Sequence, residues 1–68
     1  MSSEDLIQRI RLEAIQHSVI HGIRYIEAEA HLAHLYFAQV QFPDAELKQY
    51  INELDRDLLE FRKRMQSA

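Results

Sequence analysis

Residues 47–65 read LKQYINELDRDLLEFRKRM, a heptad pattern from which the rest of the fold can be worked out. Apolar side chains recur at alternating spacings of four and three residues, which keeps one stripe of an α-helix facing a partner helix. The pattern therefore predicts a helix over about residues 44–66. Its stripe consists of Leu47, Ile51, Leu54, Leu58, Phe61 and Met65.

A second stripe with the same spacing runs backwards from the segment Phe42-Pro43-Asp44. Pro43 disfavours the helical conformation at Phe42, and Asp44 is a good N-cap for a new helix, so the chain is expected to turn here. The two stripes are mirror images about residue 42, which predicts an antiparallel helical hairpin whose first helix spans about residues 3–41. The mirrored pairs are Phe37–Leu47, Ala33–Ile51, Ala30–Leu54, Ile26–Leu58, Ile23–Phe61 and Val19–Met65.

Gly22 is the main objection to one continuous first helix, because a glycine inside a helix costs about 1 kcal/mol relative to alanine. A break at Gly22 would give a three-helix bundle instead of a hairpin. Residues 17–21 nevertheless run directly into residues 23–26 without a proline, asparagine or aspartate to form a turn. The sequence therefore favours a continuous helix, in which Gly22 permits a close helix contact or a mild bend.

The length and composition predict an all-α chain with a single helical-hairpin domain over residues 1–68. The 68 residues include no cysteine, one glycine and one proline, so the chain can neither form two cores nor hold itself together with disulfides. Small chains of this kind usually gain stability by self-association. Because the first predicted helix is longer than the second, residues 3–18 form an overhang without a partner in the hairpin. We expect another chain to cover this overhang.

A further apolar stripe on the first helix, away from the hairpin contact, indicates where that chain would bind. A helix that is apolar on two sides is usually buried on two sides. We expect a homodimer in the form of a four-helix bundle or coiled coil, with a different protein as the alternative partner. The expected interface residues are Leu6, Ile7, Ile10, Ala14, His17, His21, Ala28, Leu32 and Leu35.

Two groups of side chains have the spacing of metal ligands. His17 and His21 lie one helical turn apart, which lets two imidazoles reach one ion, and Glu27, His31 and His34 share another face of the helix. The simpler interpretation is favoured for both groups, as polar interface residues and as a solvated flank. The five residues are candidate ligands for an alternative, metal-binding function, and no cofactor is expected.

Charge and residue content exclude several classes of function. Eight Lys and Arg residues against eleven Asp and Glu residues give a net charge of −3, which does not suit a nucleic-acid partner. The acidic N-terminus is unlike a signal peptide, and no apolar run is long enough for a membrane span, so the cytoplasm is the expected location. No cysteine, glycine-rich loop or nucleophile–base pair suggests an enzyme.

The expected function is therefore a small non-enzymatic protein-protein interaction module, such as an adaptor, a co-chaperone or a regulatory subunit. A histidine-based metal-binding bundle is the alternative, and an RNA-binding hairpin dimer ranks third. The predicted hairpin resembles the plasmid copy-control RNA-binding dimers in its fold only. Those proteins need a basic face on the first helix, whereas the basic residues of this helix are Arg9, Arg11 and Arg24, with acidic residues beside them.

Overall fold

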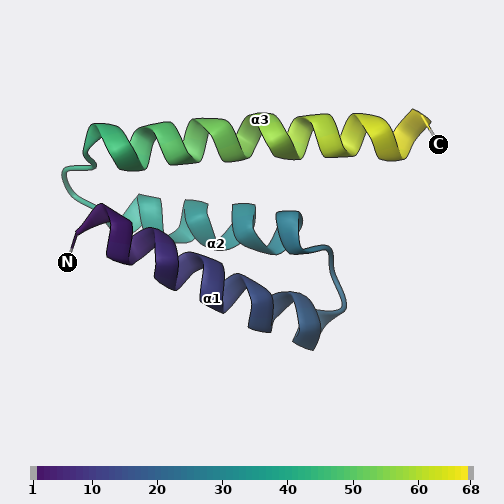
Figure 1. The fold of residues 1–68 in the computed structure, drawn as a ribbon, viewed down its shortest axis with the longest axis horizontal. Helices are drawn as coiled ribbons and strands as arrows, with labels where there is room; N and C mark the ends of the chain where they lie inside the picture. The colour runs from purple at the N-terminus through teal and green to yellow at the C-terminus, as the bar shows by residue number, and fades with distance from the viewer. Residues whose placement is uncertain (1, 68) are drawn as a thin grey trace.

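The structure, a computed structural model, describes residues 2–67 and consists there of three helices without a strand. They are α1 (Ser3–His21), α2 (Tyr25–Gln39) and α3 (Ala45–Ser67). Each helix runs antiparallel to the next, so the N-terminus lies beside the turn between α2 and α3 (Figure 1). The prediction of an all-α fold is confirmed, and so is the helix expected over residues 44–66.

Both predicted helix starts carry the caps that the sequence indicates. The Ser2 side chain accepts a hydrogen bond from the Asp5 amide at 3.2 Å, and this caps α1. At α3, the Asp44 carboxylate accepts from the Leu47 amide at 2.9 Å. These bonds satisfy amides of the first turn that have no partner inside the helix. Asp44 also accepts a hydrogen bond from the Ser3 hydroxyl at 2.6 Å, which ties the start of α1 to the start of α3.

The prediction of one continuous helix over residues 3–41 is wrong, because the chain reverses at Gly22. Gly22 has φ 63° and ψ 36°, the left-handed conformation that glycine adopts without the steric cost of a Cβ. The Gly22 and Ile23 amides both donate to the Ser18 carbonyl, and the Ser18 hydroxyl donates to the Ile23 carbonyl at 2.5 Å. The turn therefore satisfies its own polar groups and needs no proline, asparagine or aspartate.

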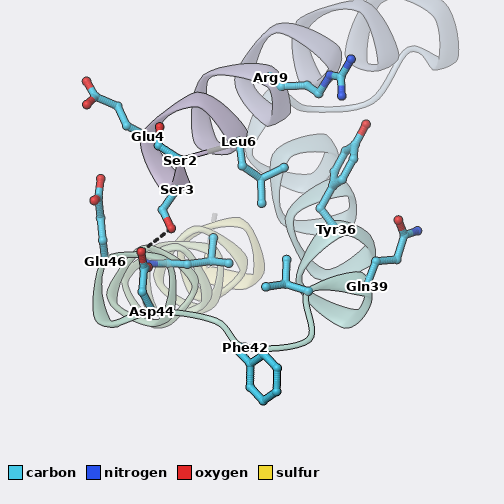
Figure 2. A pocket seen from close by; sticks show the side chains of 12 residues that line it. Ser2, Ser3, Glu4, Leu6, Arg9, Tyr36, Gln39, Phe42, Asp44 and Glu46 are labelled. Atoms are coloured by element: carbon cyan, nitrogen blue, oxygen red, sulfur yellow. Dashed lines mark hydrogen bonds between the residues drawn. The ribbon is translucent and has the colours of Figure 1, made fainter.

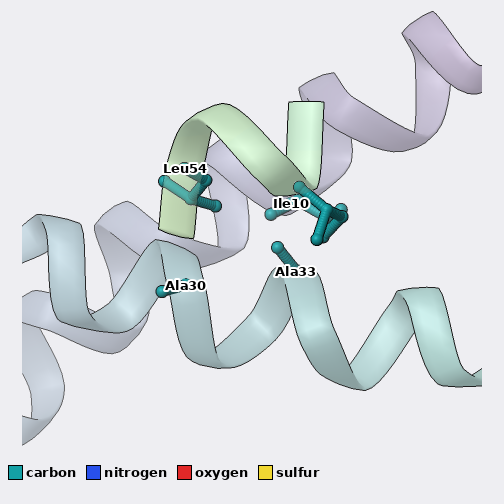
Figure 3. Packing of buried hydrophobic residues seen from close by; sticks show 5 residues of the cluster. Ile10, Ala30, Ala33 and Leu54 are labelled. Atoms are coloured by element: carbon teal, nitrogen blue, oxygen red, sulfur yellow. The ribbon is translucent and has the colours of Figure 1, made fainter. Parts of the chain in front are cut away.

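The expected overhang of residues 3–18 is also corrected, because α1 folds back along α2. Ile7, Ile10 and Ala14 point into the protein and are buried. Ile10 joins the core cluster formed with Ala30, Ala33, Ile51 and Leu54 (Figure 3). These three side chains are thus covered by the chain's own α2 and α3, whereas Leu12 and Ile15 of the same segment stay exposed.

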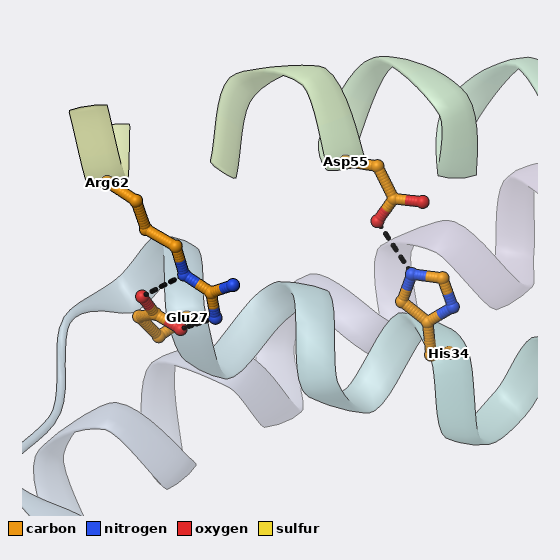
Figure 4. A network of polar contacts seen from close by, with 4 residues as sticks. All are labelled: Glu27, His34, Asp55 and Arg62. Carbon is orange, nitrogen blue, oxygen red and sulfur yellow. Dashed lines mark hydrogen bonds and ion pairs between the residues drawn. The ribbon is translucent and has the colours of Figure 1, made fainter. Parts of the chain in front are cut away.

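The contact between α2 and α3 agrees with the central mirrored pairs. Ala30, Ala33, Ile51 and Leu54 belong to one buried cluster, and Ile26, Phe37 and Leu58 pack against it. Two polar bridges on one flank of this contact agree with each other in register (Figure 4). They join His34 to Asp55 and Glu27 to Arg62, so the partners on each helix are seven residues apart, or about two turns.

The last mirrored pair, Val19–Met65, is not formed as predicted. The turn at Gly22 carries Val19 away from the line of α2, and α3 extends past this turn (Figure 1). Val19 is 78% exposed and Met65 is 53% exposed. The C-terminal part of the α3 stripe consequently lacks the helix that the sequence pattern assigns to it.

Candidate functional site

A buried carboxylate joins all three helices. Glu29 of α2 is only 7% exposed, and its Oε2 accepts a hydrogen bond from the Tyr50 hydroxyl of α3 at 2.6 Å. The Arg11 guanidinium of α1 lies 3.7 Å from the same oxygen and 5.6 Å from the centroid of the Tyr50 ring. A buried charge is tolerated when it is paired and hydrogen-bonded in this way. The group fixes the relative positions of the helices.

Glu29 is not among the site residues predicted from the sequence. The available signal is a lone glutamate between Ala28 and Ala30, within the apolar face of α2. Burial, the hydrogen bond to Glu29 and the negative charge of Glu29 raise the pKa of Tyr50, and burial with the Glu29 charge also raises the pKa of Tyr25. Both phenols therefore stay protonated at neutral pH, as donors rather than bases.

The five candidate metal ligands do not form one group. Glu27 binds Arg62 through two hydrogen bonds of 2.9 and 3.1 Å, and His34 pairs with Asp55 at 2.6 Å (Figure 4). The Arg62 hydrogen bond lowers the pKa of Glu27. These contacts direct Glu27 and His34 towards α3.

The other three candidates, His17, His21 and His31, gather where α1 meets α2. The ring centroids of His17 and His21 are 4.3 Å apart, and those of His17 and His31 are 5.7 Å apart. Burial, with the charges of His21 and His31, lowers the pKa of His17. Sequence analysis did not group His31 with the other two, because a continuous helix would separate His17 from His31 by about 21 Å. Within residues 2–67, no three histidine, aspartate or glutamate side chains are arranged to hold a metal ion.

The residues expected at the dimer interface lie partly in α1 and partly in α2. The turn at Gly22 brings these two halves of the stripe against each other. In α1, Ile7, Ile10 and Ala14 are buried, as is Ala28 in α2. Other members are only partly covered or exposed: Leu6, Leu32 and His17 are partly buried, and Leu35 and His21 are exposed. The two halves of the stripe thus meet within one chain.

A second apolar surface of α1 faces solvent. It consists of Leu12, Ile15 and Val19, which are 65%, 53% and 78% exposed, and we call it the outer stripe. Its members are spaced by three and four residues, so they lie on one face of α1, opposite the buried Ile10 and Ala14. Isolated exposed apolar residues are ordinary, whereas a line of them on one helix face marks a candidate contact surface.

An open cleft of about 600 Å³ lies at the other end of the molecule, where α1 begins and α2 ends. Leu6, Tyr36 and Leu47 are among its lining residues, with Arg9 at its rim (Figure 2). The Tyr36 hydroxyl donates to Glu13 at 2.5 Å, which raises the pKa of Tyr36 and fixes its ring against α1. Phe42 points away from the cleft into solvent (Figure 2).

Comparison of the chain with protein-family models, curated proteins and solved structures gave no match. None of the helices in residues 2–67 has the length and apolarity needed to span a membrane.

Proposed function

We propose that this chain is a small non-enzymatic protein-protein interaction module of the cytoplasm, acting as an adaptor, co-chaperone or regulatory subunit. Its first partner is a second copy of itself, in a dimer. The observation that carries the proposal is the outer stripe, since α1 is apolar on the face that contacts α2 and again on the face that contacts nothing. A helix with two apolar faces is ordinarily covered on both.

The size of the exposed surface supports an interface of ordinary dimensions. The chain exposes 5072 Å². A stable interface usually covers about 800 Å² on each partner, or about one sixth of this surface. Such an area needs a whole face of α1, and Leu12, Ile15 and Val19 would form its apolar centre. Exposed glutamines, Gln8 and Gln16, flank them as a polar rim.

The test is a sedimentation equilibrium series with a variant of the outer stripe. Leu12→Gln/Val19→Gln should weaken self-association by at least tenfold, because it removes two large apolar side chains from the centre of the interface. The helical circular dichroism should be unchanged, since neither residue lies in the core. Gln8→Ala/Gln16→Ala is the matched control and should associate like the wild type. A wild-type chain that sediments as a monomer at millimolar concentration contradicts the proposal.

A second candidate function is metal binding, favoured by the gathering of His17, His21 and His31 at the α1–α2 end. Neutral imidazoles are the usual nitrogen ligands of zinc. Zinc chloride should then raise the melting temperature of the wild type, and His31→Gln should remove the effect, whereas His34→Gln should keep it. An unchanged melting temperature of the wild type contradicts this candidate.

A further inference from the structure

The outer stripe continues the α3-facing side of α2. At about 100° per residue, a straight helix through Gly22 would place Val19 and Ile23 in line with Ile26, Ala30 and Phe37. These are the residues that the mirrored pattern assigns to α3. Arg62 of α3 bonds Glu27 near the start of α2, and the end of α3 extends past α2 (Figure 1). Val19 and its assigned partner Met65 are both exposed, so the sequence encodes a contact that the folded chain does not make.

The contact between α1 and α2 could also form between two chains. It joins the two halves of one stripe, antiparallel to each other on either side of a three-residue turn. The same antiparallel contact forms equally well between α1 of one chain and α2 of another, related by a two-fold axis near Gly22. Identical contacts within and between chains are what allow an element to be exchanged between protomers.

The turn itself can become helical. Its hydrogen bonds are donated by Gly22, Ile23 and Ser18 and are entirely local. Nothing lies within 4 Å of the position that a Cβ on Gly22 would occupy, so a side chain at this position would meet no neighbour. Residues 22–24 include no proline, and each can adopt helical dihedral angles. Gly22 is thus a hinge with few constraints beyond its own conformation.

We propose that the chain dimerises by exchanging α1 through the hinge at Gly22. Residues 3–39 straighten into one helix, the buried face of α1 packs on α2 and α3 of the second copy, and the product is a four-helix bundle. In each chain Val19 gains Met65 as a neighbour. The inference rests on the proposed function for its partner, the second copy, and assigns the contact to the buried face of the exchanged α1 instead of the outer stripe.

The energetic balance makes this exchange sensitive to the hinge. The contacts of α1 with α2 are the same in the closed chain and in the dimer, so they do not favour either form. What differs is the hinge conformation, the new Val19–Met65 contact in each chain and the entropy lost on association. Dimer formation should therefore depend on protein concentration and on the identity of residues 22 and 24.

Two hinge variants test the exchange in opposite directions. Gly22→Ala disfavours the left-handed turn and favours a helix, so it should lower the dimer dissociation constant about tenfold per chain, or about a hundredfold in all. Arg24→Pro should keep the chain closed. Arg24 already has φ −65°, the value that proline fixes, and a proline there would interrupt the straight helix. Its amide is not among the donors of the turn.

Sedimentation velocity and small-angle scattering of the full chain give the outcome. The expected result is a dimeric Gly22→Ala chain, a monomeric Arg24→Pro chain and a wild type between them. The longest dimension should grow from 39 Å in the closed chain to at least about 55 Å in Gly22→Ala. Circular dichroism checks that both variants are folded, and dilution of the wild type provides the same comparison without a substitution.

The possible failures separate the two proposals. If the wild type and both variants associate equally, the exchange is overturned, whereas association through the outer stripe stands. A Gly22→Ala chain that is monomeric while the wild type dimerises also overturns the exchange and leaves association through the outer stripe standing. If every variant and the wild type are monomeric at millimolar concentration, both proposals fail.

Discussion

The α2–α3 contact and the α1–α2 contact bury similar apolar residues, but only the first could be predicted from the sequence. In α2 and α3, a proline-centred turn, an aspartate cap and matched stripes all specify the same hairpin. Across the α1–α2 turn, the stripes fit a straight helix and a folded one equally well. The difference shows that stripe patterns specify which faces are buried, whereas the hinge residue decides which chain segment covers them.

The largest expected effect is the loss of stability when a core side chain is shortened on either side of this comparison. Leu54→Ala in α3 and Ile10→Ala in α1 should each cost about 2–5 kcal/mol in urea unfolding, because both side chains are buried in one cluster. Leu59→Ala, at an exposed position of α3, is the control and should change stability by less than about 0.5 kcal/mol.

Leu54→Ala and Ile10→Ala together distinguish a folded-back α1 from a projecting one. If α1 projected from a hairpin as an overhang, Ile10→Ala would leave the stability of a monomer unchanged. A cost for Leu54→Ala without one for Ile10→Ala, measured at a concentration where the chain is monomeric, would contradict the folded-back position of α1.

The buried Glu29 should have the next largest effect, because it joins the predicted and the unpredicted contact. Glu29→Ala leaves the Tyr50 hydroxyl without its partner and should cost about 1–3 kcal/mol. Glu29→Gln keeps an acceptor and should cost less. Glu53→Ala, an exposed glutamate of α3, is the matched control. Equal unfolding midpoints for Glu29→Ala and Glu53→Ala would remove the role assigned to the three-helix group.

Part of the fold could be predicted from the sequence, and part could not. The caps at Ser2 and Asp44, the bounds of α3 and the register of Ala30 and Ala33 with Ile51 and Leu54 follow from short-range chemistry. The reversal at Gly22 does not, because glycine permits both a helix and a left-handed turn and the choice depends on packing elsewhere. The gathering of His17, His21 and His31 and the three-helix Glu29 group depend on that reversal, so neither could be predicted.

Alkaline pH should weaken the Glu29 group. The pKa of Tyr50 is raised in the folded chain, so the unfolded chain loses its phenol proton first as the pH rises above about 10. This contribution to stability is full below pH 10 and is lost as the pH rises towards the folded pKa. Melting temperatures from pH 8 to 11 should fall less steeply for Tyr50→Phe than for the wild type. Equal slopes of melting temperature against pH for the two proteins would contradict the stabilising role of the Tyr50 hydroxyl.

Acidic pH should lower the stability through His17, near the C-terminal end of α1, by less than alkaline pH does through Tyr50. Because the pKa of His17 is lowered in the folded chain, the unfolded chain binds the proton first as the pH falls below about 6.5. This contribution is present above pH 6.5 and is lost as the pH falls towards the folded pKa. The melting temperature should decline between pH 7.5 and 5, with a shallower decline for His17→Gln. His34→Gln is the control, and an equally shallow decline for that variant would contradict the effect of the cluster.

The most direct test of the account is a distance within one chain between residues 8 and 39. The chain lacks cysteine, so Gln8→Cys/Gln39→Cys can carry two spin labels at exposed positions, and an excess of unlabelled protein suppresses distances between chains. At low total concentration we expect a short distance, with α1 folded onto α2. A second distance of about 46 Å should gain in population with concentration, as residues 3–39 straighten. A distance of about 46 Å at every concentration would contradict the turn at Gly22, and a short one at every concentration would contradict the exchange of α1.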